Sequence, residues 1–307
     1  MYADDTQLYV SFNRKDQDII FENVQKCMQH IKWWMKTNYL KLNAGKTEVL
    51  FINNKADKTP NPMSILLQEN DDQPTEPSTE ARNLGIWFDQ TLSMSSHVSR
   101  IIQSCWSQLA NLWRIRKGLS VELKTQLVHA LVHSRLDFGN ALLVGLSKRD
   151  LQRLQKVQNS ATRFICGSKG RRGVTEMRMK LHFLPVEQRI EFKICLLVYK
   201  CLHGLVPDYL AEMITRRQPK TRKVRLDEDL TLLERRHDHK YLSTQKAFSV
   251  CAPKIWNKLP RNLREATSLE MFKTMLKSHL FAITYPDCRK VPGTPRTKTR
   301  ILNPSCQ

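Results

Sequence analysis

Hydrophobic residues change their spacing near residue 95, from short apolar runs between polar turns to a sustained helical period. In the first part, one helical face from Ile20 to Met35 is apolar and the other polar, which predicts a long amphipathic helix. Runs rich in Tyr, Val, Phe and Ile predict short strands around this helix. The strands are expected at 7–12, 48–52, 64–67 and 84–88.

After Ser95 the period is helical almost throughout. Ser120 is placed to cap a helix, and Pro185 and Pro207 stand where prolines commonly begin one. Helices are predicted at 96–117, 120–134, 149–166, 174–182, 186–204, 207–217 and 268–281. The predicted fold class is therefore α+β and mainly helical, with a small antiparallel sheet and one helix before an all-helical region.

Composition predicts further divisions along the chain. Residues 1–94 hold the small sheet and its helix, including an exposed, Pro-rich loop at 53–80. A helical region, a charged linker, a small C-terminal domain and a disordered tail are expected at 95–217, 218–240, 241–285 and 286–307.

Positive charge is concentrated in the second part of the chain. The 307 residues carry 50 Lys and Arg against 29 Asp and Glu, a formal net charge of +21. Residues 1–100 hold 11 basic and 13 acidic residues, whereas residues 101–307 hold 39 and 16. Such a field predicts a polyanionic partner, most commonly nucleic acid, with a basic protein that binds no polyanion as the alternative.

Several protein classes are excluded. No apolar run reaches the roughly 18–20 residues of a membrane span, and no signal peptide is visible, so no membrane partner is expected. The eight cysteines form no Cys-x-x-Cys pair, which favours an intracellular, reduced setting over a disulfide scaffold. Buried thiols are favoured over a zinc site at Cys195, Cys201 and His203.

Adjacent carboxylates at Asp4 and Asp5 are the most specific chemical feature. On a turn between strands, they can present an oxygen cluster to a hard cation such as Mg²⁺. An isolated Asp-Asp turn is commonly just solvated. The strand, amphipathic helix and second strand predicted to follow favour a functional role.

The sequence Tyr-Ala-Asp-Asp-Thr-Gln-Leu-Tyr at residues 2–9 resembles the catalytic box of reverse transcriptases from non-LTR (LINE) retrotransposons. Further segments resemble other parts of these proteins, in the same order along the chain. They are similar to the next palm motif, to the primer-grip hairpin and to the post-polymerase region of jockey-type and vertebrate elements. They lie at 42–48, 84–98, 184–190, 199–210, 248–260 and 268–281. The chain thus resembles a C-terminal fragment of such a reverse transcriptase, beginning at the Tyr-Ala-Asp-Asp box.

The resemblance implies roles for individual residues around a two-metal Mg²⁺ site. Asp4 would be a metal-binding carboxylate, Asp5 its less direct partner, and Tyr2 would pack near the primer end. Lys46 would lie near the incoming triphosphate as a proton donor, with a solvated turn lysine as the equal alternative.

The primer grip implied by the resemblance would include Gly85 and Trp87, although ordinary strand packing is the favoured explanation for Trp87.

An intact enzyme of this family also has an earlier metal-binding Asp and the fingers, and the sequence contains neither of them. Residues 1–94 would then be a partial palm and 95–217 a thumb-like extension. The predicted function is a remnant of an RNA-directed DNA polymerase, inactive alone because its Mg²⁺ site is incomplete. The alternatives are a non-catalytic, sequence-nonspecific nucleic-acid-binding protein and a poorly folded product with unpaired sheet edges.

Clusters of Lys and Arg are candidate phosphate contacts, for an RNA template with a DNA primer or for duplex nucleic acid. Solvated charged faces are the alternative. The run at 220–225 also matches a nuclear localisation pattern, which favours the nucleus over the cytoplasm. The candidates are Arg114, Arg116, Lys117, Arg149, Arg153, Lys156, Lys169, Arg171, Arg172, Lys220, Arg222, Lys223 and Arg225.

Two further sets of side chains could bind a ligand or could simply pack in the protein. Trp33, Trp106 and Trp113 could stack on bases, but their helical spacing favours core packing. His129 and His133 lack the Glu of a zinc-binding His-Glu-x-x-His helix, so core or surface histidines are predicted.

Overall fold

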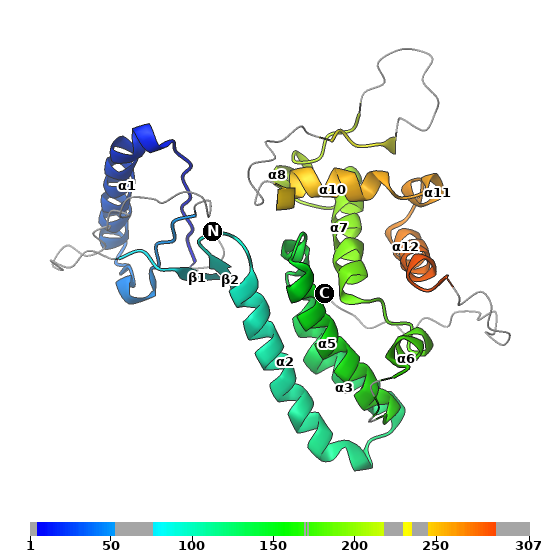
Figure 1. Ribbon diagram of the computed structural model, residues 1–307. Coiled ribbons are helices and arrows are strands. Elements are labelled where there is room, and N and C mark those ends of the chain that lie inside the picture. Colours follow the sequence, from blue (N-terminus) through cyan, green and yellow to red (C-terminus); the bar gives the residue numbers. More distant parts are fainter. Residues whose placement is uncertain are drawn as a thin grey trace, which may run out of the picture. The chain divides into compact units, whose positions relative to one another are not determined.

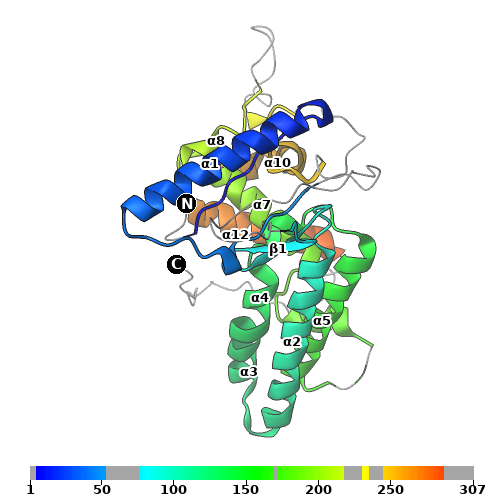
Figure 2. The ribbon, with the colours of Figure 1, turned by 90° about the vertical axis from the view of Figure 1, so that its left-hand side faces the viewer.

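The computed structural model describes residues 5–52, 76–168, 170, 172–217, 230–234 and 245–286 (Figures 1 and 2). This part of the chain is mainly helical, with a small two-stranded antiparallel sheet, as the predicted fold class requires. Contacts divide the chain into two compact units, Met1–Ser96 and His97–Gln307. They are called the N-terminal and C-terminal units below.

The N-terminal unit is built around one long helix and one hairpin. Its elements are η1 (Arg14–Asp16), α1 (Gln17–Thr37), η2 (Ala44–Lys46), β1 (Glu80–Asn83) and β2 (Ile86–Asp89). Helix α1 confirms the predicted amphipathic helix, because it buries Phe21 and Met28. The Phe21 ring lies 5.6 Å from Phe12 and 5.4 Å from Phe51, and these aromatic contacts form the core of this unit.

The hairpin β1–β2 corrects the strand predicted at 84–88. Leu84 and Gly85 form a two-residue turn, with φ angles of 46° and 84°, between the paired residues Asn83 and Ile86. Positive φ at both central positions is the geometry of a tight hairpin turn, and glycine adopts it without strain. The strand itself runs from Ile86 to Asp89.

Two other strand predictions are wrong. Residues 7–12 are extended but belong to no strand, and 48–52 contribute a single isolated bridge, between Leu50 and Ser78. β-Branched and aromatic residues favour extended backbone, but a strand also needs a partner to pair with. The strand predicted at 64–67 lies outside the described residues.

The turn between β2 and the next helix is organised by Asp89. Its carboxylate accepts hydrogen bonds from the backbone N–H groups of Thr91, Ser93 and Met94 at 2.8–3.0 Å, and from two hydroxyls. Burial pushes the pKa of Asp89 up, but the hydrogen bonds from Thr91, Ser93 and Met94 outweigh it and hold that pKa below its ordinary value. These bonds also hold Leu92 and Met94 at positive φ.

The described part of the C-terminal unit is mainly helical. Its main helices are α2 (Ser95–Ile115, which starts at the end of the N-terminal unit), α3 (Val121–Val128), α4 (Ser134–Asp137), α5 (Lys148–Cys166), α6 (Val174–Lys180), α7 (Val186–Leu202), α8 (Asp208–Ala211), α10 (Phe248–Asn257), α11 (Arg261–Arg264) and α12 (Leu269–Thr284). Short turns η3 (Arg116–Gly118) and η5 (Asn140–Leu143) and a π-helix η4 (His129–His133) connect some of them. No described helix is both long and apolar enough to span a membrane.

Helix α7 is the centre of this unit, and α10 and α12 pack against it (Figure 1). The Tyr199 ring stacks on Phe272 at 4.5 Å, and its hydroxyl donates to the Ala266 carbonyl at 3.0 Å. Phe272 in turn lies beside Trp256. The segment predicted as a small separate domain, 241–285, therefore shares its core with the preceding helices.

Two predictions after α7 also need correction. The helix expected at 207–217 is limited to α8, and further along that range Arg216 forms a bridge with Leu232. Residues 230–234, predicted as part of a linker, are packed against α10: Leu232 is buried and exchanges two hydrogen bonds with the Asn257 side chain. The rest of the predicted linker and residues 287–307 of the predicted disordered tail lie outside the described residues.

Candidate nucleic-acid interface

Helices α2 and α5 lie side by side and run in the same direction (Figures 1 and 2). Near their N-termini, the Arg153 guanidinium donates to the Ser99 hydroxyl at 3.0 Å. Near their C-termini, the rings of Trp113 and Phe164 meet edge to face at 5.5 Å. The two contacts fix the relative register of the helices along most of their length.

This helix pair is strongly cationic. Its two sequences contain seven Lys and Arg residues and one acidic residue, Asp150. The Asp150 carboxylate is already engaged, because it accepts from Arg153 at 2.9 Å and from the Ser147 hydroxyl at 2.9 Å. Neither helix contains another carboxylate, so the pair carries a net positive charge whose field favours a polyanion.

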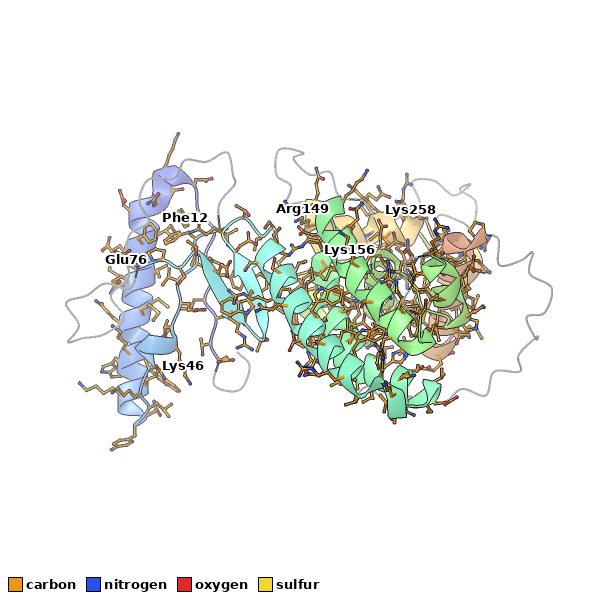
Figure 3. All side chains as sticks on the ribbon, turned by 60° about the horizontal axis from the view of Figure 1, so that its bottom comes forward. Phe12, Lys46, Glu76, Arg149, Lys156 and Lys258 are labelled. Carbon is orange, nitrogen blue, oxygen red and sulfur yellow. The ribbon has the colours of Figure 1, made fainter. Side chains whose placement is uncertain are left out.

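The three predicted cations of α5, Arg149, Arg153 and Lys156, differ in what they contact. Arg149 and Lys156 are exposed and lie on the same side of the helix, two turns apart (Figure 3). Arg153 lies between them but donates to both Asp150 and Ser99. Arg149 and Lys156 are therefore the candidates for phosphate contact, whereas Arg153 joins α5 to α2.

A second group of cations lies at the C-terminal end of α2. Arg114 is in the last turn, and Arg116 and Lys117 follow in η3. The Arg116 guanidinium lies over the Trp113 ring, 5.0 Å from its centroid, so this side chain is held in place by a cation–π contact. Arg114 and Lys117 are exposed.

Eleven residues of α5 separate the contact at Arg153 from the contact at Phe164, a distance of about 16 Å at the helical rise. The predicted cations therefore form two patches on one helix pair. Patch A consists of Arg100, Lys148, Arg149 and Lys156, and patch B of Arg114, Arg116 and Lys117.

Patch A includes two residues that the sequence pattern did not identify. Arg100 is isolated among apolar and polar residues of α2, and Lys148 precedes the predicted helix start. Both are exposed. Arg100 follows Ser99, whose hydroxyl accepts from Arg153 of α5, so its place beside α5 depends on how the two helices pack, and no local signal could have found it.

Of the predicted cations outside α2, η3 and α5, the structure describes Arg172. Arg172 is exposed in the turn before α6. The remainder lie outside the described residues: Lys169, Arg171, Lys220, Arg222, Lys223 and Arg225.

The predicted core packing of two tryptophans is wrong. Trp33 is 68% exposed and Trp106 is 44% exposed, whereas Trp113 is half-buried against Phe164. Helix α2 buries the face that includes Cys105 and Leu109, and Trp106 lies about 100° around the helix from Cys105. An exposed indole is a surface on which a nucleobase can stack.

Only some of the residues to which the polymerase resemblance gives a role can be placed near one another. Gly85 and Trp87 lie on the β1–β2 hairpin. The Asn83 amide of this hairpin donates to the Gln7 side chain at 2.8 Å, which connects it to the segment after the exposed Asp5. Asp4 and Tyr2 lie outside the described residues.

Lys46 is exposed in η2, a turn whose neighbour Glu48 accepts from the Arg82 backbone N–H at 2.9 Å (Figure 3). The hairpin is thus connected by hydrogen bonds to the segments that carry both Asp5 and Lys46.

Within the described part of the chain, the His, Cys, Asp and Glu residues form no group of three or more that could hold a metal ion. Cys195 and Cys201 are buried, as predicted, and burial raises the pKa of Cys195 to about 12.

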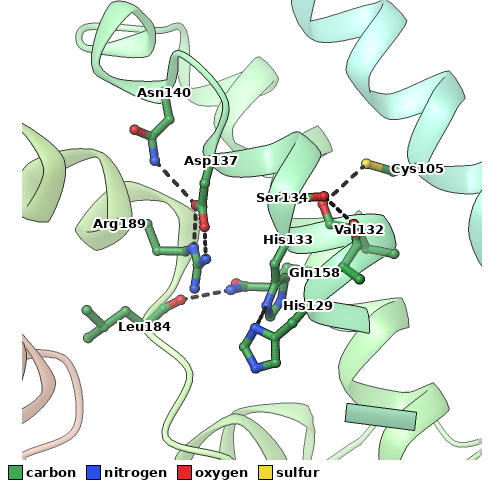
Figure 4. Close-up of polar contacts among 11 residues, drawn as sticks. Cys105, His129, Val132, His133, Ser134, Asp137, Asn140, Gln158, Leu184 and Arg189 are labelled. Atoms are coloured by element: carbon green, nitrogen blue, oxygen red, sulfur yellow. Dashed lines mark hydrogen bonds and ion pairs between the residues drawn. The ribbon is translucent and has the colours of Figure 1, made fainter. Parts of the chain in front are cut away.

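A part-buried polar cluster holds the end of the α3–η4–α4 segment against α7 (Figure 4). The Asp137 carboxylate binds the Arg189 guanidinium through two hydrogen bonds and also accepts from Asn140. In η4, the Nδ1 atoms of His129 and His133 lie 3.3 Å apart. The same two rings contact Phe183 edge to face.

Because of His133, the stability of the folded protein is expected to depend on pH. Burial, with the nearby Arg189 guanidinium and His129, holds the pKa of His133 well below its ordinary value. The unfolded chain therefore binds a proton that the folded chain does not, and stability falls as pH drops below about 6.5. We expect the free energy of unfolding to fall by at most about 1.4 kcal/mol per pH unit from this residue.

Urea denaturation at neutral and mildly acidic pH measures that dependence. The variant His133→Leu should lose part of it, whereas the exposed His30→Gln on α1 should retain it. An unchanged pH dependence in His133→Leu would refute the assignment.

No family model matches this chain, and no curated protein or solved structure shows a significant likeness to it.

Proposed function

We propose that this protein binds nucleic acid through the α2–α5 helix pair. The observation that supports the proposal is the charge of that pair: seven cations against one carboxylate, which is itself bound to Arg153 and Ser147. Lys and Arg side chains on phosphates position a duplex without reading its bases, so the binding would be sequence-nonspecific.

The two patches suit an extended ligand better than a small anion. Arg100 of patch A and Arg114 of patch B are fourteen positions apart on α2, about 21 Å at the helical rise, and one phosphate cannot contact both. A nucleic-acid backbone supplies phosphates at short, regular intervals and can span that distance. The surface of α2 between the patches contains the exposed Trp106, which adds a stacking contact.

We further propose that the chain is part of an RNA-directed DNA polymerase of the non-LTR retrotransposon kind. The ordered series of likenesses from residue 2 to residue 281 supports this proposal. The N-terminal unit would then be palm and the helices after Ser95 thumb-like. Asp4 and Asp5 would supply oxygen ligands to Mg²⁺. The template, the primer and an intracellular, nuclear location are parts of the same proposal.

A primer-extension assay separates binding from catalysis. We expect the 307-residue protein to shift a labelled RNA–DNA primer–template and to incorporate no nucleotide with Mg²⁺ or Mn²⁺, because two metals need carboxylates from more than one segment. Template-dependent incorporation that disappears in Asp4→Ala would show an active polymerase instead. Absence of any shift at low salt would contradict the binding proposal.

A further inference from the structure

Helix α1 exposes two adjacent tryptophans, Trp33 and Trp34, which are 68% and 55% exposed. Phe21 and Met28 mark the buried face of this helix. At roughly 100° per residue, Trp33 lies about 140° from Met28 in one direction around the helix, and Trp34 about 120° in the other. The two indoles therefore lie on the outer face of α1, away from the core of the N-terminal unit.

A third exposed ring follows at the C-terminal end of α1. The Leu40 N–H donates to the Met35 carbonyl at 2.8 Å and the Tyr39 N–H to the Lys36 carbonyl at 3.2 Å, which is the Schellman pattern that ends many helices. The left-handed position of this motif is most often glycine, but here it is Tyr39, with a φ of 57°. Tyr39 is 99% exposed, so burial of its ring does not offset the backbone strain.

The chain around these three rings is positively charged. Residues 30–46 contain four lysines and no acidic residue, although residues 1–100 hold 11 basic and 13 acidic residues. Lys41 follows closely after the turn at Tyr39 and is exposed. Exposed rings with cations among them are typical of surfaces that bind single-stranded nucleic acid, because bases stack on the rings while cations contact the phosphates. An uncharged apolar partner would match the rings but not the lysines.

We propose that segment 33–41 binds unpaired nucleobases, as a site separate from the α2–α5 helix pair. Bases of a single strand stack on Trp33, Trp34 and Tyr39, and Lys41 contacts a phosphate. Bases inside a duplex are already paired and stacked, so they reach these rings only after unpairing. The site therefore prefers single strands, and it does not depend on the phosphate contacts proposed for patches A and B.

The test compares two labelled single strands of equal length and charge, a thymidine oligomer of about 12 nucleotides and an abasic strand. Fluorescence anisotropy with the full chain should show at least about fivefold weaker binding of the abasic strand, because it cannot stack. Trp33→Ala/Trp34→Ala should lose a similar factor for the thymidine strand alone. Tyr209→Ala is the matched control, because it removes a ring that is 67% exposed on α8, and it should change neither affinity.

Tyr39→Gly separates binding from folding. Glycine adopts the left-handed conformation without strain but has more freedom in the unfolded chain, so the variant should unfold at a similar urea concentration. It should nevertheless bind the thymidine strand more weakly, because one stacking ring is lost. An unchanged affinity for that strand would contradict the role of Tyr39.

Photocrosslinking to a strand that contains 5-iodouracil locates the contact, which is expected on the tryptic peptides 33–36 and 37–41. Arg149→Gln/Lys156→Gln should lose duplex affinity and keep these crosslinks, whereas Trp33→Ala/Trp34→Ala should do the reverse. The two binding proposals therefore fail separately. Crosslinks confined to other peptides, equal affinity for the abasic strand, or a dimer in light scattering that Trp33→Ala/Trp34→Ala abolishes would each overturn the proposed site.

Discussion

Replacing Trp256 with Ala is expected to lower the free energy of unfolding of the C-terminal unit by about 3–5 kcal/mol. Trp256 is 1% exposed, and its ring lies 5.7 Å from Phe272 in the core around α7. Its indole N–H also donates to the Leu230 carbonyl at 3.1 Å, which would be left without that donor. Urea denaturation followed by circular dichroism measures the change.

Trp106→Ala is the control for this substitution. Trp106 is 44% exposed on α2, so the same truncation should change the free energy of unfolding little. The shape of the transition is also informative. Because α10 and α12 pack on α7, Trp256→Ala should destabilise the whole unit in one transition. An early transition confined to the C-terminal helices would support the separate domain that the sequence predicted.

The double variant Arg149→Gln/Lys156→Gln is expected to weaken nucleic-acid binding at every sequence tested. Both side chains are exposed on α5, and neither has an acidic partner among the described residues. Each lost phosphate contact should reduce the slope of log affinity against log salt by about 1, and therefore by about 2 for the pair. Fluorescence anisotropy with labelled duplexes of unrelated sequence measures both effects.

A second double variant with the same net charge controls for the effect of the protein's overall electrostatic field on binding. Lys26→Gln/Lys273→Gln removes two exposed or part-exposed lysines, each bound to a glutamate, on α1 and α12. Its affinity and its salt slope should stay close to those of the wild type. Equal losses in the two double variants would mean that net charge, rather than the α2–α5 surface, determines binding.

The sequence predicted elements whose signal is local. Helices α1, α2, α5, α7 and α12 follow from apolar periodicity, and each was expected within a few residues of its bounds. The strands at 7–12 and 48–52 were not formed, because pairing depends on a neighbour that periodicity does not identify. Residues 230–234 lie within the predicted linker because their surroundings are charged, but Leu232 is buried against α10.

In the candidate interface, too, the sequence predicted local features but not those that depend on packing. The sequence identified Arg149, Arg153 and Lys156 as candidate phosphate contacts. It could not show that Arg153 is bound to Ser99 of α2, or that Arg100 belongs to patch A, because both depend on how two helices pack. Exposure of Trp106 likewise depends on which face of α2 is covered.

The central claim is that the helical surface binds nucleic acid through its phosphates. The most direct measurement is the affinity of the wild-type protein for a labelled duplex at a series of salt concentrations. We predict that log affinity falls linearly with log salt, with a slope that corresponds to several phosphate contacts, and equally for unrelated sequences. An affinity independent of salt, or no binding at low salt, would contradict the claim.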